Sequence, residues 1–305
     1  MAQAPASPKL KRAALLAAAA VVGPKLAGGG EAQAASERAA LHLREAAQGH
    51  GWAAPQQVVF LIPLVAQDHV GDWQAVVLRL HLTLSSLIAQ DNPNWRAVIC
   101  CQQRPALPDD PRISYLPFDD PAPGNDKWRK LACLYDHLPS LDINAGYAMS
   151  FDADDLLRQG TVAEMLSRNV KGGYLVQAGY VMDASTGAVA LADAPDPRQP
   201  LRKPFWKLCG SCAALRFDLS LPGMVDFLRE MTQHEHRMFP YLARLAGQRL
   251  QPLSRPSVLY VLNHGENFGA RRGRVGFKTR FVVRFQIDDP TELAAIKADF
   301  PALDS

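Results

Sequence analysis

The sequence predicts an α/β protein with a mostly parallel, doubly wound central sheet. Residues 58–65 (VVFLIPLV) are continuously apolar and rich in β-branched side chains, which is typical of a strand buried on both faces. Apolar residues within 71–90 recur at helical spacing, so a helix is expected to follow that strand. A second, mostly apolar run at 147–151 ends abruptly in a group of carboxylates at 152–155. This alternation of strands and helices favours a parallel sheet.

The other expected elements follow in chain order. In the first half, strands are expected at 96–101, at 113–118 and in the run ending at Asp152, with a helix at 127–137. In the second half, strands are expected at 173–182, 211–217, 258–262 and 280–286, and helices at 222–232 and 234–246. A long loop is expected over 183–204, and loops of this length are usually functional or disordered.

The chain divides into a main domain with an extension at each end. Residues 1–54 form the N-terminal extension, which is of low complexity to about residue 35 and helical at 36–48. Its basic residues followed by an alanine-rich run at 13–22 resemble the order of a secretory signal, but the run is too short to span a bilayer. We therefore expect residues 1–35 to lie outside the fold. Residues 55–289 form the main domain, and 290–305 a tail.

Composition excludes several classes of protein. The 305 residues are 48% hydrophobic and carry a net charge of +3, which gives no reason to expect a nucleic acid polymer as partner. The five cysteines are too few and too irregular for a disulfide framework, and reduced thiols favour the cytoplasm. Cys209 and Cys212 form a single C-x-x-C that no second pair completes as a zinc site.

The carboxylates at 152–155 indicate a cation site. Alternation along a strand projects Asp152 and Asp154 to the same face, at the edge of the sheet where α/β proteins bind ligands. Adjacent carboxylates repel each other unless positive charge lies between them, and a hard ion such as Mg²⁺ or Mn²⁺ shared with phosphates satisfies both. The alternative is a solvated acidic turn that caps the next helix.

Two segments resemble family 2 glycosyltransferases. TLSSLIAQDNPNWRAVICC (residues 83–101) is similar to the first helix and second strand of that family, and SFDADDLL (residues 150–157) is similar to its "xLDADD" segment. The resemblance implies the GT-A fold, a nucleotide-sugar donor and Mn²⁺ or Mg²⁺. It also implies that Asp152 lies near the donor ribose and nucleotide, that Asp154 holds the metal, and that Asp155 orients the loop or caps the next helix.

The sequence departs from the family pattern at two places. The family acid that contacts the base is replaced by Gln102, which could still hydrogen-bond a base. The family's Glu-Asp pair, whose acid deprotonates the acceptor, is replaced in HEHRMFPYLARLAG (residues 234–247) by Glu235 followed by His236. Glu235 is the candidate catalytic base, with the flanking histidines able to tune it or serve instead. A charged residue at a helix start is the structural alternative.

Further candidates lie upstream and downstream of these acids. Lys127 and Lys130 precede the acidic strand and are candidate donor-binding residues, or else ordinary helix charges. His264, in a loop after the last predicted core strand, is a candidate metal ligand or a loop histidine bonded to backbone. The basic run from Arg271 to Arg284 could attract a diphosphate or a phospholipid surface, or be a solvated edge strand.

The sequence as a whole predicts a metal-dependent, bacterial hexosyl- or rhamnosyltransferase of polysaccharide biosynthesis, inverting in stereochemistry. The expected partners are a nucleotide-sugar donor, a glycan or lipid-linked acceptor, and the inner membrane through peripheral contact. The alternatives are a catalytically inactive relative that binds glycan or nucleotide, and a nucleotidyltransferase. The nucleotidyltransferase should carry a glycine-rich phosphate loop after the first strand, where this chain has only Gly71.

Overall fold

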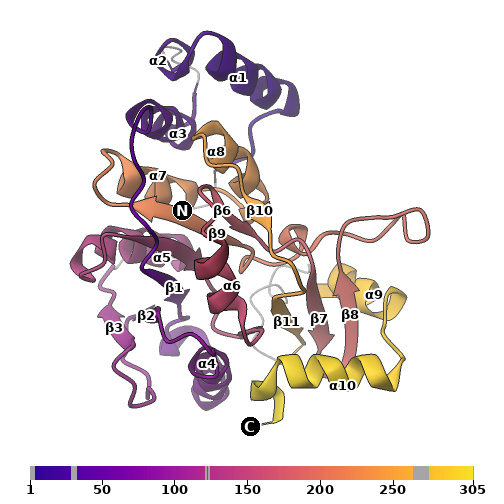
Figure 1. Ribbon diagram of the computed structural model, residues 1–305. Coiled ribbons are helices and arrows are strands. Elements are labelled where there is room, and N and C mark those ends of the chain that lie inside the picture. Colours follow the sequence, from indigo (N-terminus) through magenta and orange to yellow (C-terminus); the bar gives the residue numbers. More distant parts are fainter. Residues whose placement is uncertain (1–3, 29–32, 121, 123, 264–274, 305) are drawn as a thin grey trace.

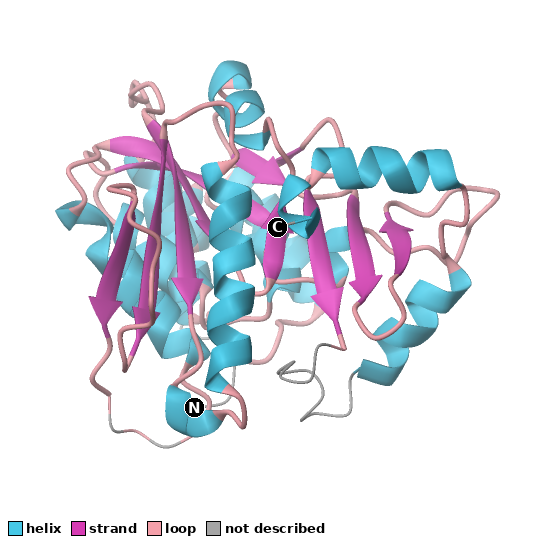
Figure 2. Cartoon of the chain, turned by 90° about the horizontal axis from the view of Figure 1, so that it is seen from below, coloured by secondary structure: helices cyan, strands magenta, loops and turns pink. Residues whose placement is uncertain are grey.

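A computed structural model of the chain describes residues 4–28, 33–120, 122, 124–263 and 275–304 (Figure 1). It is a mixed α/β structure with a seven-stranded, mostly parallel central sheet, flanking helices and a second sheet of four strands. In Figure 2 the strands of the two sheets lie next to each other, with helices packed around them.

The first half of the chain builds the parallel part of the central sheet. Its elements are β1 (Gln57–Pro63), α4 (Trp73–Ile88), β2 (Trp95–Cys101), β3 (Ile113–Pro117), α5 (Lys127–His137) and β4 (Ala145–Ser150). β1 pairs in parallel with β2 and β4, and β2 pairs in parallel with β3. Val58 to Ile62 have no exposed surface, as their continuous apolar pattern predicts. Because these strands are parallel, the residues that follow β2 and β4 lie at the same edge of the sheet.

The second half completes the central sheet with antiparallel pairing. It contributes α6 (Thr161–Arg168), β6 (Gly173–Leu175), β9 (Ala213–Asp218), α7 (Met224–Met231), α8 (Phe239–Leu245) and β10 (Gln251–Pro252). β9 runs antiparallel to both β4 and β6, and the strand order is β10-β6-β9-β4-β1-β2-β3. The expected helix at 234–246 is shorter than predicted, because Pro240 occupies the first turn of α8 and a short 3₁₀ helix precedes it.

The second sheet was not expected from the sequence. Its strands are β5 (Asp155–Leu157), β7 (Gly179–Asp183), β8 (Ala188–Ala192) and β11 (Val258–Leu262), in the order β5-β11-β7-β8. The prediction of one strand at 173–182 is wrong, because the chain leaves the central sheet after Leu175 and re-enters the second sheet at Gly179. The predicted loop at 183–204 contains β8, which pairs with β7 as an antiparallel hairpin.

The C-terminal part of the chain is helical. The predicted strand at 280–286 is wrong, because residues there belong to α9 (Val275–Arg284). Phe281 and Val282 are buried, and the ring of Phe281 lies beside that of Phe285. Residues four apart lie on the same face of a helix, so this contact is typical of helical spacing. The expected tail contains α10 (Pro290–Asp299), and its Ile296 is buried. The described 3₁₀ helices are η1 (Gln67–His69), η2 (Leu138–Ser140), η3 (Phe205–Lys207), η4 (His236–Met238) and η6 (Pro301–Asp304).

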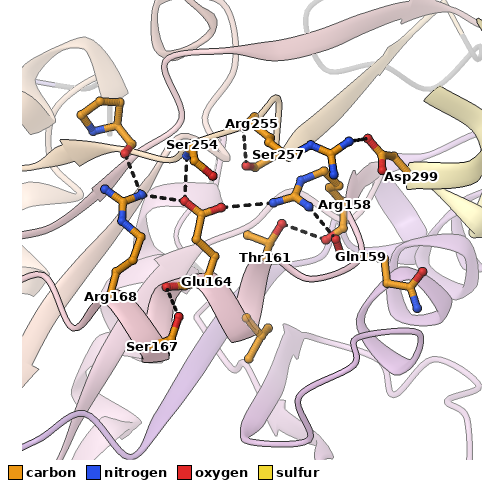
Figure 3. Close-up of polar contacts among 12 residues, drawn as sticks. Arg158, Gln159, Thr161, Glu164, Ser167, Arg168, Ser254, Arg255, Ser257 and Asp299 are labelled. Atoms are coloured by element: carbon orange, nitrogen blue, oxygen red, sulfur yellow. Dashed lines mark hydrogen bonds and ion pairs between the residues drawn. The ribbon is translucent and has the colours of Figure 1, made fainter. Parts of the chain in front are cut away.

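An ionic network joins the two sheets (Figure 3). Glu164 of α6 accepts a hydrogen bond from the backbone N–H of Ser254 at 2.7 Å, and its other oxygen lies 3.2 Å from Nη2 of Arg158, which follows β5. Arg255 pairs with Asp299 of α10 at 2.7 Å. The network therefore holds α10 and the second sheet against α6, a helix of the central layer.

The N-terminal segment belongs to the folded structure. It forms α1 (Lys9–Val21), α2 (Pro24–Ala27) and α3 (Ala35–Ala46), and α3 packs on α7 and α8. Glu37 of α3 is fully buried and accepts hydrogen bonds from the hydroxyls of Ser7 (2.7 Å) and Tyr241 (3.0 Å). The expectation that residues 1–35 lie outside the fold is therefore wrong for the described part. Within the described residues, no helix is both long enough and apolar enough to cross a bilayer.

Candidate functional site

Three carboxylates leave the middle of the central sheet together. They follow β4, which lies between β1 and β9. Asp152 and Asp154 are half-buried, and Asp155 is buried. One ligand oxygen from each lies within 4.8 Å of the others, and no other group of three His, Cys, Asp or Glu side chains in the described part of the chain does the same. The helix-cap alternative is wrong, because β5 intervenes and α6 begins after Gly160.

The loop before β9 holds two of these acids in place. The backbone N–H of Asp152 donates to Oγ of Ser211 at 2.8 Å, and that hydroxyl donates to Oδ2 of Asp155 at 2.5 Å. The thiol of Cys209 donates to the same Oδ2 at 3.0 Å. The other oxygen of Asp155, Oδ1, is buried and has no hydrogen-bond partner in the structure. A buried acceptor without a partner is costly, so this oxygen is suited to a positively charged ligand.

Burial and like charge act together on Asp155. Burial is the larger cause that raises its pKa well above the usual range, and the nearby carboxylates of Asp154 and Asp152 raise it further. Without added positive charge, the buried group is held towards its neutral form. A cation between the three side chains would reverse both effects, because it favours the ionised carboxylates.

Two lysines bring positive charge to the acids. Lys127, the first residue of α5, lies with Nζ 2.6 Å from Oδ1 of Asp152. Burial alone would lower the pKa of Lys127, but Asp152 and then Asp154 outweigh it and raise the pKa. Lys278 of α9 donates from Nζ to the hydroxyl of Tyr260 at 2.5 Å, and burial lowers its pKa although Cys209, Asp155 and Asp152 act in the opposite direction.

A tyrosine and a histidine complete the surroundings. Tyr260 of β11 is the strand partner of Asp155 in β5, and burial followed by the negative groups around it raises its pKa well above the usual range. His236 opens η4, and burial together with the charges of Arg237, Lys127 and Lys278 lowers its pKa to about 4. Its Nε2 atom is buried with no hydrogen-bond partner in the structure. The lowered pKa favours the neutral form of the imidazole, whose Nε2 can accept a hydrogen bond.

Two other predicted donor-binding residues are tied to each other through Asp126: Gln102, which directly follows β2, and Lys130, which lies in α5. Gln102 donates from Nε2 to Asp126 at 2.7 Å, and the Nζ atom of Lys130 lies 2.8 Å from the same carboxylate. Lys130 is fully buried and also donates to the carbonyl oxygen of Leu64 at 2.7 Å. Oε1 of Gln102 is buried and has no partner in the structure, so one polar atom of this group is still able to accept a hydrogen bond.

The two remaining predicted site residues are Glu235 and His264. Glu235 directly precedes η4 and is half-buried next to His236. His264 lies outside the described residues, so its predicted role as a metal ligand stays a prediction.

Sequence reasoning missed Lys278, Tyr260 and Cys209 as members of the site. Lys278 belongs to the basic run for which the sequence predicts a solvated loop and edge strand, whereas α9 places it beside Tyr260, the strand partner of Asp155. Tyr260 falls in a correctly predicted strand, but the pairing of that strand with β5 has no signal in the local pattern. The CGSC segment that contains Cys209 resembles only an incomplete zinc motif in sequence, whereas Ser211 and Cys209 hydrogen-bond to Asp152 and Asp155.

Comparison with known proteins adds little to this description. No family model matches the chain, and no curated protein matches it. Among solved structures, the crystal structure of S. aureus TarS is similar over 68% of this chain and 37% of that chain, with 11% sequence identity and a TM-score of 0.35. This chain thus spans well under half the length of that structure. At this TM-score the similarity carries no argument about function.

Proposed function

We propose that this protein is a metal-dependent glycosyltransferase of GT-A architecture, which moves a sugar from a nucleotide-diphosphate donor to a glycan, lipid or small-molecule acceptor. The observation that carries the proposal is the meeting of three carboxylates and two lysines at the ligand-binding edge of the parallel sheet. Glycosyl transfer requires the departing nucleoside diphosphate to be stabilised, and such a mixture of anionic ligands and cations serves that purpose.

The carboxylates fit a hard divalent ion. All three offer oxygen ligands, which Mg²⁺ and Mn²⁺ prefer, and the unpartnered Oδ1 of Asp155 is an orphaned acceptor inside the group. Asp154 would hold the ion, with Asp152 and Asp155 within reach of it. When bound, the ion supplies positive charge that neutralises the two phosphates of the donor.

The lysines act on the same phosphates from the protein side. Lys127 and Lys278 approach the acids from α5 and α9, so their ammonium groups lie on two different elements around the site. In the donor complex we expect them to donate hydrogen bonds to diphosphate oxygens, and these bonds strengthen as the leaving group gains charge. Tyr260 keeps Lys278 in position before the donor binds.

A base must take the proton of the acceptor hydroxyl. Glu235 stays our first candidate, and His236 is the second because its buried, unpartnered Nε2 belongs to a neutral imidazole. Glu235→Gln should lower kcat far more than it changes donor affinity if Glu235 is the base. If that variant keeps its turnover while His236→Gln loses it, the histidine is the base.

Hydrolysis of nucleotide sugars tests the proposal without a known acceptor. We expect at least one member of a panel of nucleotide sugars to be hydrolysed slowly in the presence of Mn²⁺ or Mg²⁺. Asp154→Ala should abolish the metal-dependent rate, while Asp226→Ala, a change of the same kind at an exposed position on α7, should not. An unchanged rate of hydrolysis in the presence of EDTA, or in the Asp154→Ala variant, would contradict the proposal.

One observation favours a second candidate, a nucleotide-binding relative without catalysis. The Lys127–Asp152 ion pair already neutralises one of the acids without a metal ion. Such a protein would bind uridine diphosphate, as seen by a shift in unfolding temperature, with no gain from Mn²⁺ and no turnover of any donor. A transferase should instead be stabilised by metal and nucleotide together.

A further inference from the structure

Apart from Lys9 at its first position, the exposed residues of α1 are all apolar. Residues at helical spacing along its outward side are all exposed: Leu10, Ala13, Ala14, Ala17 and Val21. The exposed fractions of Leu10 and Val21 are 86% and 82%, the two highest among the large apolar side chains of the described chain. A helix on a protein surface normally presents polar residues to water. After Lys9, this helix presents only apolar residues at its exposed positions.

The opposite side of α1 is fixed against the protein. Leu15 and Ala19 are buried, and α1 contacts α8. Arg12 lies over the ring of Tyr241 at 5.5 Å and donates to the sulfur of Met238 at 3.4 Å. These contacts settle the rotation of the helix, so its other side points away from the molecule. In Figure 1, α1 and α2 lie at one end of the structure, with α3 and α8 between them and the central sheet.

Exposed apolar side chains continue into α2. Val22 and Leu26 are 52% and 76% exposed. We call Leu10, Val21, Val22 and Leu26 the N-terminal apolar surface. Four of the nine large apolar side chains that are exposed in the described chain fall within these seventeen residues, 10–26. Isolated exposed apolar residues need no explanation, but a concentration of them marks an interaction surface.

The charges of the segment that forms this surface have one sign. Lys9 and Lys25 are exposed at its two ends, and no aspartate or glutamate occurs among the first 30 residues of the sequence. An apolar helix face bordered by lysines is complementary to an anionic phospholipid surface, where the face enters the acyl boundary and the ammonium groups meet the headgroups. The 13 residues of α1 are too few to span a bilayer, which takes about 20.

We propose that α1 and α2 dock this protein on an anionic phospholipid bilayer, with the N-terminal apolar surface lying in the interface. The proposal does not depend on the transferase activity. The sequence suggests a peripheral membrane contact without indicating which part of the chain makes it, and the proposal assigns that contact to α1 and α2.

Sedimentation with lipid vesicles tests the proposal on the full chain. We expect the protein to bind vesicles of phosphatidylcholine with about 30% phosphatidylglycerol, and to bind pure phosphatidylcholine much less, because anionic lipid attracts the lysines. The double variant Leu10→Asp, Val21→Asp should lose at least about tenfold in affinity, since charged side chains are costly in the acyl region. Both side chains are exposed, so the fold should tolerate the change, which circular dichroism and thermal unfolding check.

Leu78→Asp is the matched control. Leu78 is 63% exposed on α4, outside the N-terminal apolar surface, so this variant should bind vesicles like the unmodified protein. Absence of binding to anionic vesicles, or equal binding by the double variant, would overturn the proposal. A dimer in solution that dissociates in the double variant would assign the surface to a second copy of the chain and overturn it as well.

Discussion

Asp155→Asn separates the effect of the buried carboxylate on stability from its proposed role in binding a metal ion. Asp155 is fully buried, and only its Oδ2 accepts hydrogen bonds, from Ser211 and Cys209. An asparagine has nearly the same shape and keeps an acceptor for Ser211. Its amide nitrogen, in place of the unpartnered Oδ1, is a donor beside the carboxylates of Asp152 and Asp154. The change therefore removes one of three clustered negative charges with little change in packing.

The expected effect on the metal-free protein is a gain in stability. A buried polar atom without a partner costs about 1–3 kcal/mol, so relieving it should raise the free energy of unfolding by about 1 kcal/mol or more. For a chain of 305 residues, each 1 kcal/mol corresponds to roughly 1.5–2 °C in Tm. The gain in stability grows as pH rises, because the pKa of Asp155 is raised in the folded state. The unmodified protein is stabilised relative to the unfolded state while the group is protonated, and loses that stability as pH rises through the folded pKa. The Asn variant does not lose stability in this way, because asparagine does not ionise.

The effect on ligand binding is the opposite. At a metal-nucleotide concentration of about 100 times the Kd, the unmodified protein should gain about 2.7 kcal/mol. The Asn variant should gain much less, because it lacks one anionic ligand. Thermal unfolding in EDTA, and then with Mn²⁺ and uridine diphosphate, measures both effects. Ser211→Ala is the control, since it removes a hydrogen bond to Asp155 and keeps the charge. A metal-free Asn variant that is less stable than the unmodified protein, with an undiminished ligand gain, would refute the reasoning.

Three further predictions concern the N-terminal helices, the junction of the sheets and the site. Burial alone would raise the pKa of Glu37, but its hydrogen bonds lower it, so the stability that Glu37 adds is present above the unfolded pKa and is lost as pH falls through the folded pKa. Glu37→Gln should lower the free energy of unfolding by about 1–2 kcal/mol at pH 7, measured by urea unfolding, and should reduce the dependence of that free energy on pH. An unchanged pH dependence would contradict this. A Cβ on Gly179 would overlap the ring of Phe205, so Gly179→Ala should lower the unfolding free energy by about 1–3 kcal/mol, and an unchanged denaturation midpoint would show that the ring moves at no cost. Lys278→Gln should reduce kcat by about 10- to 100-fold with a smaller change in KM, and a change in KM alone would remove the lysine from the leaving-group role.

Local patterns in the sequence were enough to predict the parallel half of the central sheet. Residues 58–65 are apolar at every position, which is typical of a strand buried on both faces, and 127–137 form α5 with the predicted bounds. The grouping of the acids at 152–155 was also predictable, because it follows from where β4 ends. Each of these features depends on residues close together in the chain.

The second sheet and half of the site depend on contacts between distant residues. Nothing in the pattern around Gly179 or Val258 says that these strands leave the central sheet, since both sheets bury apolar side chains. The FVVRF segment beginning at Phe281 satisfies both strand and helix periodicity, and tertiary packing decides for the helix. Lys278 reaches the acids only because of that helix. The signal-like order of the first 30 residues likewise gives no indication that α1 packs on α8.

The position of a bound cation tests the central claim most directly. Crystals grown with Mn²⁺ and uridine diphosphate, measured near the manganese absorption edge, should show an anomalous peak among the carboxylates of Asp152, Asp154 and Asp155, next to the phosphates of the nucleotide. If nucleotide binds while manganese is absent from these three side chains, or occupies a different place in the protein, the claim that they gather a catalytic ion is contradicted.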